Sequence, residues 1–336
     1  MSISVRQVKQ TRRDRRAFIE LPYRLYRGNV QWVAPFRSDM QRLLDPRVHP
    51  FHQHSDTALF VAEKAGRVVG RITAHVNHLY DERWDRKTGF FGFFESEEDP
   101  TIAQALLDAA GQWLRERGKQ VIMGPFNWSM NEECGTLVEG FNQPPVVMMP
   151  YNPPSYPVLL ESAGLTKAKD LYAYWMDDPK QVPPRLQRGY DLVSKRRKIT
   201  YRMLDMSRFR EEVELGRQLY NEAWADNWGE VPATEAEFRY LAKELKQIIR
   251  PELVFFAYVD GKLAGFSLSV PDANVALQKA HGRLFPLGIF RVLASLRSIS
   301  HMRVITLGVL KEYRLSGVDV ALYYATFKHG REIGIN

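Results

Sequence analysis

The sequence has one cysteine, Cys134, among 336 residues. A single cysteine can form neither an intrachain disulfide nor a thiolate metal site, and we expect a cytoplasmic protein. No window approaches the roughly 18 uninterrupted apolar residues of a membrane span, and no apolar stretch follows the charged residues 1–16, so neither a span nor a secretory signal is expected. The length predicts two domains, and the composition is ordinary for globular proteins.

Acidic residues are fewer than basic ones. The chain has 39 Asp and Glu against 47 Lys and Arg, a formal net charge of +8. Much of the excess lies in two clusters, within 12–16 and 195–198, which we interpret as solvated faces. A basic surface suits any polyanion, but the sequence has no nucleic-acid-binding motif, so nucleic acid is not an expected partner.

The chain contains an internal repeat. Residues 57–76 and 253–271 are apolar, β-branched or aromatic runs broken by a short turn with glycine, which is typical of hairpins. They align without a gap at an offset of 195 (261 − 66). The segments 90–118 and 306–334 align at an offset of 216 (308 − 92), again with glycines in register. This order indicates a duplication, with an insertion in the second copy within about 272–300.

Each copy is predicted to run helical segment, hairpin, strand, turn and helix. In the first copy we expect a helix from Asp99, a suitable N-cap, to Gly118. A strand at 120–124, a helix near 154–163 and a strand at 170–176 should follow. The second copy should begin with helices around 207–225 and 234–249. The stretch 177–190 contains three prolines and is the expected linker. The predicted domains are 1–178, a linker and entry strand at 179–200, and 201–336.

In the second copy a strand at 303–310 runs through a turn into a helix. Arg314-Leu315-Ser316-Gly317-Val318-Asp319 stands where that helix begins. A helix N-terminus has unpaired N–H groups and partial positive charge. Gly317 lets an anion approach the backbone closely, and Arg314 adds a full charge. Phosphate groups bind at such places.

This arrangement resembles the pyrophosphate-binding motif of the GNAT N-acetyltransferase superfamily, a strand followed by Arg/Gln-x-x-Gly-x-Gly/Ala and a helix. Arg314, Ser316 and Gly317 stand in its places, whereas Asp319 departs from its third small residue. The resemblance implies an α+β fold with two tandem GNAT-like domains, each a mixed, mostly antiparallel sheet flanked by helices. It also implies that acetyl-CoA or another acyl-CoA binds the second copy, at Gly308, Val309, Leu310, Arg314, Leu315, Ser316, Gly317, Val318 and Asp319.

The first copy differs at the matching turn. Glu98 aligns with Arg314 and Thr101 with Gly317, within the acidic run 95–99. Acidic side chains there stabilise the start of a helix but repel a pyrophosphate. In addition, Leu160 stands where the family often has a catalytic tyrosine. The first copy is therefore predicted to be degenerate. Because only two residues follow Gly334, we also expect the second copy to lack its C-terminal strands.

The resemblance implies direct attack of an amine on the thioester carbonyl near the end of strand 303–310. In the family, acceptor contacts come largely from the segment between the first two helices, here 221–230. The alternative is that its tryptophans are core residues and its Asn and Gly form turns. The loop 124–135 either lines a cleft between the copies or bonds its own backbone. Candidate bases are Glu222, Asp226 and Glu230, and candidate substrate contacts are Asn221, Trp224, Asn227, Trp228, Asn127, Asn131 and Glu133.

Three classes of function remain open at this point. The first is an acyl-CoA-dependent N-acyltransferase acting on a small-molecule or peptide amine. The second is a FemABX-like transferase using aminoacyl-tRNA, which the basic run 195–198 would suit. The third is a non-catalytic binding protein. No metal is expected, because His49, His52 and His54 have only two acids nearby in sequence, and nothing suggests a histidine partner that would make Cys134 a nucleophile.

Overall fold

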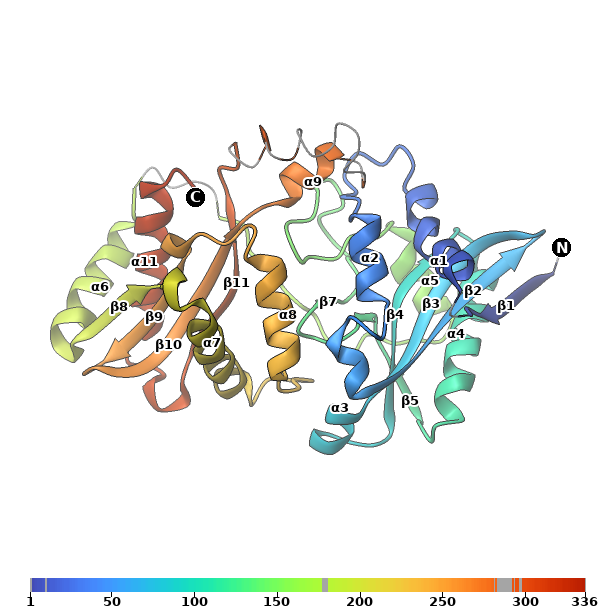
Figure 1. Cartoon of the computed structure of the whole chain (residues 1–336), viewed down its shortest axis with the longest axis horizontal. Coiled ribbons are helices and arrows are strands. Elements are labelled where there is room, and N and C mark those ends of the chain that lie inside the picture. Colours follow the sequence, from blue (N-terminus) through green and yellow to red (C-terminus); the bar gives the residue numbers. More distant parts are fainter. Residues whose placement is uncertain are drawn as a thin grey trace. The chain divides into compact units, whose positions relative to one another are not determined.

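The computed structural model describes residues 2–9, 11–176, 181–280, 282, 292, 294–295 and 298–335. The chain divides into two compact units, Met1–Tyr172 with Leu277–Val292, and Ala173–Ala276 with Leu293–Asn336 (Figure 1). The division after Tyr172 lies close to the predicted boundary at 178.

The first unit contains a five-stranded sheet with the order β1-β2-β3-β4-β5. All neighbouring strands are antiparallel except β4 and β5, which are parallel. Its elements are β1 (Ile3–Gln7), α1 (Arg12–Leu25), α2 (Arg37–Leu43), η1 (Pro50–Gln53), β2 (Ser55–Lys64), β3 (Arg67–Asn77), α3 (His78–Arg83), β4 (Thr88–Ser96), α4 (Pro100–Arg115), β5 (Val121–Met123), β6 (Phe126–Asn127), β7 (Glu133–Cys134) and α5 (Ser155–Ser162).

The second unit contains a four-stranded antiparallel sheet with the order β11-β10-β9-β8. Its elements are α6 (Pro184–Arg197), β8 (Ile199–Met203), η2 (Met206–Arg208), α7 (Phe209–Trp224), α8 (Glu235–Leu245), η3 (Pro251–Leu253), β9 (Val254–Val259), β10 (Lys262–Pro271), the start of α9 (Asn274–Ala280), β11 (Met302–Val309), η4 (Lys311–Tyr313) and α11 (Val318–Glu332).

Both predicted hairpins are present, and their turns explain the glycines. Ala65 and Gly66 have φ of 52° and 74°, and Asp260 and Gly261 have φ of 47° and 77°. Two successive residues with positive φ suit the right-handed twist of the flanking strands. The element order agrees between the units, so the predicted architecture of two tandem, mostly antiparallel α+β domains is confirmed.

Each sheet buries both of its faces. In the first unit, α4 and α5 pack on the face carrying Phe60 and Ile72, and α1 and α2 pack on the face carrying Leu59 and Val61. In the second unit, α6 and α11 cover one face and α7 covers the other. Adjacent residues of a strand point to opposite faces, which is why the central strands are apolar on both sides.

Three sequence predictions were wrong in detail. The segment 170–176 is not a strand, and its side chains are exposed. The predicted linker contains helix α6, because Pro184 occupies the first helical position, where the missing N–H costs no bond. Part of the predicted insertion belongs to the first unit, where Gln278 Nε2 donates to Val30 O at 2.7 Å; residues 281, 283–291, 293 and 296–297 lie outside the described residues.

Candidate functional site

The turn between β11 and α11 forms the centre of the predicted cofactor site. Eight residues, 310–317, separate the two elements. Leu315 has φ of 62° and is fully exposed, and Gly317, the N-cap residue, has φ of 94°. No side chain caps α11. Its first N–H groups therefore lack both an intrahelical acceptor and a side-chain cap.

Packing as well as backbone conformation requires glycine at position 317. A φ near 94° strongly favours glycine. In addition, a Cβ atom there would lie 2.5 Å from Val193 Cγ1 on α6. Ser316 is buried and its Oγ donates to Tyr313 O at 2.5 Å, so this hydroxyl stabilises the turn itself.

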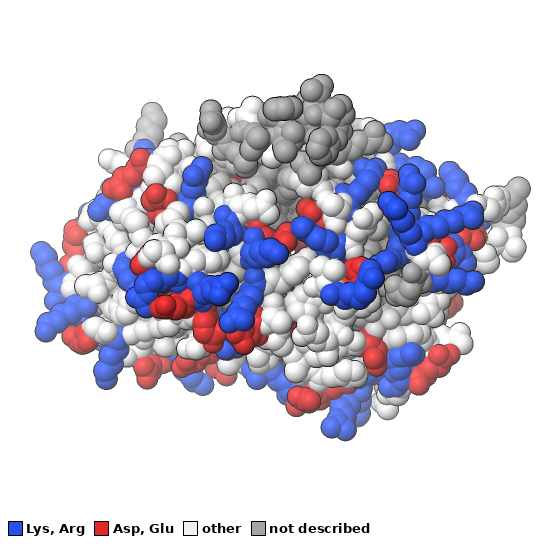
Figure 2. All heavy atoms as spheres, viewed as in Figure 1, with Lys and Arg blue, Asp and Glu red and all other residues white. Residues whose placement is uncertain are grey.

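Helix α6 runs antiparallel to α11. Tyr190 stacks on Tyr324 with centroids 4.0 Å apart, and one turn later Val193 lies beside Gly317. The last residues of α6 therefore extend past the beginning of α11. These residues include the exposed basic cluster Lys195–Lys198, which sequence reasoning interpreted as a solvated face. Figure 2 shows exposed Lys and Arg side chains at the edge of this unit, in the region that α6 occupies in Figure 1.

Arg314 lies between the turn and the end of α7. Its Nη2 donates to Ala223 O at 3.1 Å, and its Nη1 is 3.9 Å from Asp226 Oδ2. Lys311 Nζ is 3.3 Å from the same carboxylate oxygen. The Arg314 side chain remains 44% exposed. The structure thus brings the predicted cofactor turn together with the beginning of the predicted acceptor segment.

The acceptor segment is more involved in packing than the sequence predicted. Trp224 stacks on Tyr220 with centroids 5.0 Å apart. A Cβ atom on Gly308 would lie 2.1 Å from the Trp224 ring, so the ring covers the end of β11. Asn221 accepts from Ala233 N at 2.9 Å and donates to Ala233 O at 3.1 Å. Its amide holds the loop, and its role as a substrate contact stays a prediction.

The three candidate bases differ in environment. Glu222 is exposed, Asp226 pairs with Lys311, and Glu230 is buried at 4% exposure. Two other predicted substrate residues, Asn227 and Trp228, are exposed beyond the end of α7, and the Asn227 N–H donates to Trp224 O at 2.8 Å. This geometry does not single out one base.

In the first unit, the matching helix start is capped. Asp99 accepts from Thr101 N at 3.0 Å and lies 3.0 Å from Lys64 Nζ. The hydrogen bonds from Thr101, together with Lys64, lower the pKa of Asp99 to about 2. Only three residues, 97–99, separate β4 from α4. The helix caps therefore pair Gly317 with Asp99, whereas the ungapped alignment paired Gly317 with Thr101; the longer turn of the second unit causes this shift.

A buried ionic cluster lies beside this turn. Glu95 belongs to β4, where it accepts from Tyr156 Oη at 2.7 Å and Tyr26 Oη at 3.0 Å and lies 3.5 Å from Arg71 Nη2. Burial raises the pKa of Glu95 and lowers that of Arg71. Leu160 is a core residue one turn after Tyr156. Sequence reasoning missed this cluster because its members come from four segments that are far apart in the sequence.

The loop 124–135 is bonded within the first unit. Asn127 Oδ1 accepts from Phe93 N at 2.7 Å, at a bulge of β4 where Phe93 has φ of 48°. Asn127 Nδ2 lies 3.5 Å from Glu133 Oε2, and Asn131 N donates to Ser129 Oγ at 3.2 Å. These contacts favour the interpretation that the loop's polar groups satisfy its own backbone and that of β4.

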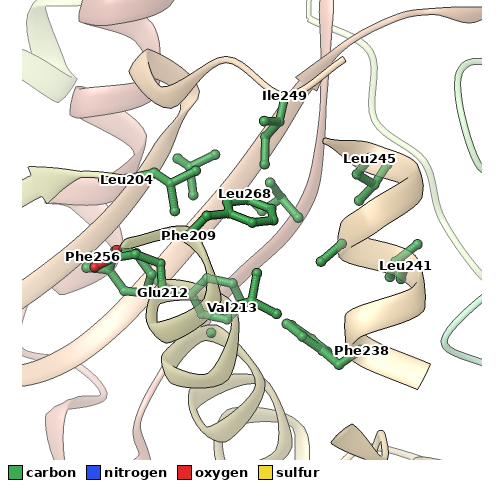
Figure 3. A pocket seen from close by; sticks show the side chains of 14 residues that line it. Leu204, Phe209, Glu212, Val213, Phe238, Leu241, Leu245, Ile249, Phe256 and Leu268 are labelled. Carbon is green, nitrogen blue, oxygen red and sulfur yellow. The ribbon is translucent and has the colours of Figure 1, made fainter. Parts of the chain in front are cut away.

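An apolar cavity, partly open to solvent, lies between α7, α8 and the sheet of the second unit (Figure 3). Its enclosed volume is about 60 Å³, and the whole space between its lining residues, open solvent included, is about 500 Å³. Among the described residues that line it, Glu212 is the one with a charge, and its carboxylate is 2.7 Å from Arg202 Nη1. Sequence reasoning missed the cavity because its lining is spread over 204–268. The lining consists of Leu204, Phe209, Glu212, Val213, Gly216, Phe238, Leu241, Ala242, Leu245, Ile249, Val254, Phe256, Phe266 and Leu268.

Two curated sequences are similar to this chain over most of its length. The bacterial ceramide synthase of Caulobacter vibrioides is 37% identical over 341 residues, covering 99% of this chain and 87% of that protein. The protein YghO of Escherichia coli is 36% identical over 308 residues, covering 91% of this chain and 78% of that protein. The chain belongs to the bacterial ceramide synthase family. No family model matches this member of the family.

Solved structures similar to this ceramide synthase family member include two described as GNAT proteins. A tandem GNAT protein from the clavulanic acid biosynthesis pathway aligns over 99% of this chain and 87% of its own, with a TM-score of 0.49 and 13% identity. A GCN5-related glucosamine N-acetyltransferase region of a fungal β-N-acetylglucosaminidase aligns over 98% of this chain and 34% of its own, with a TM-score of 0.48 and 14% identity.

The described residues contain neither a membrane-spanning helix nor a cluster of metal ligands. Among the helices that the structure describes, none is long and apolar enough to cross a bilayer. The described residues of this family member also hold no group of three or more His, Cys, Asp or Glu side chains placed to bind a metal ion.

Proposed function

We propose that the protein is an acyl-CoA-dependent N-acyltransferase that acylates the amine of a long-chain base. A ceramide is the amide of a fatty acid and a long-chain amino alcohol, so an enzyme named ceramide synthase joins an acyl group to an amine. Membership of that family supports N-acylation for this chain. The sequence motif of β11 and α11 supports acyl-CoA as the donor.

One observation carries the cofactor assignment. The two units begin their equivalent helices in opposite ways, α4 with the carboxylate of Asp99 and α11 with Gly317 and no side-chain cap. A diphosphate at α11 would accept hydrogen bonds from the free N–H groups and interact with the helix dipole. Arg314 and the basic cluster Lys195–Lys198 would add positive charge around it.

The end of β11 is suited to hold the thioester. β11 forms an edge of the described sheet, and Leu310 N donates to Ala264 O on the β10 side. Because N–H directions alternate along an antiparallel strand, the N–H of Val309 points to the open edge. In the proposed reaction this N–H donates to the carbonyl oxygen as the amine attacks, and it stabilises the developing negative charge.

The amide product provides the test. Purified protein is incubated with acyl-CoA of two to eighteen carbons and with a long-chain base such as sphinganine, and CoA release and amide mass are measured together. We expect an amide to form with equal release of CoA, and Val309→Pro, which removes the N–H, to lose that activity. Absence of both CoA binding and amide formation with every pair of substrates would refute the proposed function.

A further inference from the structure

The apolar cavity of the second unit lies close to the proposed reaction centre along two elements. Phe266, which lines it, packs against Trp224 with ring centroids 6.3 Å apart, and the Trp224 ring covers Gly308 on β11. The first half of α7 lines the cavity from Phe209 to Gly216, and the last residue of the helix is Trp224. An occupant of the cavity could therefore belong to a molecule whose reactive end lies at β11.

The chemistry of the lining restricts the occupant to an uncharged, apolar group. Aliphatic and aromatic side chains from α7, α8, β9 and β10 face the space (Figure 3). The carboxylate of Glu212 is buried and paired with Arg202. The Arg202 guanidinium also packs over the Phe256 ring at 4.6 Å, and its Nε donates to Tyr258 Oη at 3.0 Å. Because Arg202 already pairs with this carboxylate, the cavity offers no free charge to bind an amine or a phosphate.

The cavity leaves room for only a small side chain at position 216. Gly216 is a helical residue of α7 that lines the cavity opposite Phe238, and a Cβ atom there would lie 3.6 Å from the Phe238 ring, an ordinary contact. Alanine therefore fits without strain, and a larger side chain would project into the space. The enclosed part of the cavity is about 60 Å³, so it has room for a short segment of a hydrocarbon chain, and the rest of the chain would lie in the part that is open to solvent.

We propose that this cavity binds the hydrocarbon chain of a substrate, so that α7, α8 and the sheet select substrates by chain length. The inference rests on the proposed function, because acyl-CoA and a long-chain base each carry such a chain. Burial of one methylene group contributes about 0.8 kcal/mol, which corresponds to about a fourfold gain in affinity. Affinity should therefore rise about fourfold per carbon until the cavity is full and then level off.

The experiment measures chain-length profiles in the full chain. One series varies the acyl-CoA from two to eighteen carbons with sphinganine fixed, and the other varies the alkyl length of the amine with one acyl-CoA fixed. In wild type, kcat/KM should rise and then level off in one series, which identifies the chain that the cavity holds. In Gly216→Leu the plateau should come several carbons earlier, with a loss of tenfold or more for the longest chains.

Matched variants separate blocking from unfolding. Gly216→Ala should keep the wild-type profile and raise the thermal midpoint, because alanine favours helix over glycine. Ala242→Leu enters the same space from α8 and should shorten the preferred chain as Gly216→Leu does. In folded variants, kcat/KM should fall more for the longest substrates than for the shortest ones.

The outcomes distinguish this inference from the proposed function. An active wild type whose profile does not depend on chain length would overturn the cavity assignment and leave N-acyl transfer intact. The same holds if folded Gly216→Leu and Ala242→Leu both keep the wild-type profile. A wild type inactive with every pair refutes the proposed function, and binding of free sphinganine or palmitoyl-CoA, measured by calorimetry in wild type and Gly216→Leu, still tests the cavity.

Discussion

Replacing Arg314 with Gln should weaken the binding of CoA about tenfold. The side chain stands at the turn that leads into α11, and in the proposed function it adds a charge-assisted hydrogen bond to the diphosphate. Such bonds contribute about 1.5–3 kcal/mol, or roughly 10- to 150-fold in affinity. The guanidinium is 44% exposed, so water screens it and the lower end of that range applies.

Arg314 also has a structural role that the assay must separate. Its Nη2 donates to Ala223 O in the last turn of α7, and loss of this bond should lower the free energy of unfolding by about 0.5–1.5 kcal/mol, with or without CoA. Calorimetry with CoA gives the dissociation constant, and urea unfolding of the unliganded protein gives the stability change. Repeating the titration at higher salt should narrow the difference between wild type and variant.

Glu98→Gln in the first unit is the control, because Glu98 lies in the turn before α4 and pairs with Arg314 in the ungapped sequence alignment. Its Oε1 accepts from Ser155 Oγ at 3.1 Å. This change should leave CoA affinity unaltered. Equal affinity in folded Arg314→Gln and wild type would place the cofactor elsewhere, and weaker binding in Glu98→Gln would assign it to the first unit.

Asp319→Asn should tighten CoA binding about two- to fivefold and lower stability by about 0.3–1 kcal/mol, because a carboxylate in the first turn of α11 repels phosphate but favours the helix dipole; weaker binding by calorimetry would contradict this. Lowering the pH from 7 to 5 should lower the free energy of unfolding by about 2 kcal/mol for each of two histidines, the half-buried His52 and the buried His75. Burial lowers the pKa of His52 to about 4 and of His75 to about 3, so only the unfolded chain gains their protons in this range. His75→Phe should halve this loss in urea unfolding, and an unchanged pH slope would disprove the assignment. Glu95→Ala should destabilise the fold by about 3–5 kcal/mol because it leaves Arg71 buried without its carboxylate partner. The double variant with Glu95→Leu and Arg71→Met should recover part of that loss. A Glu95→Ala variant as stable as wild type would refute this prediction.

The hairpins and the helices around them could be predicted because their signals are local. Ala65-Gly66 and Asp260-Gly261 set the turns, and Asp99 and Gly118 mark the ends of the helical region after β4. The segment 170–176 shows the limit of such reasoning. It has the composition of a strand, but a strand also requires a paired neighbour, and these side chains are exposed.

The site was only partly predictable because its contacts join distant segments. The sequence placed Gly317 and Arg314 on one turn, which is local. It could not show that Val193 on α6 lies beside Gly317, that Trp224 covers Gly308, or that the Asn221 amide holds Ala233. Each of these contacts depends on which helix packs against which strand. Local patterns in a single sequence do not reveal that packing.

The two units show why a shared fold does not give a shared site. In the first unit the side chain of Asp99 caps the start of α4, whereas in the second unit Gly317 leaves the start of α11 without a side-chain cap. The strand pairs before these helices also differ. Glu95 on β4 is opposite Arg71 on β3 in the first unit, and at the matching position in the second unit Gly308 on β11 is opposite Phe266 on β10. A three-residue turn with its own acidic cap leaves little backbone for a phosphate, whereas eight residues with a positive-φ glycine present several N–H groups. Removal of the Asp99 carboxylate alone would therefore expose a helix end without making a binding turn, because the length of the turn, and not only its charge, separates the two copies.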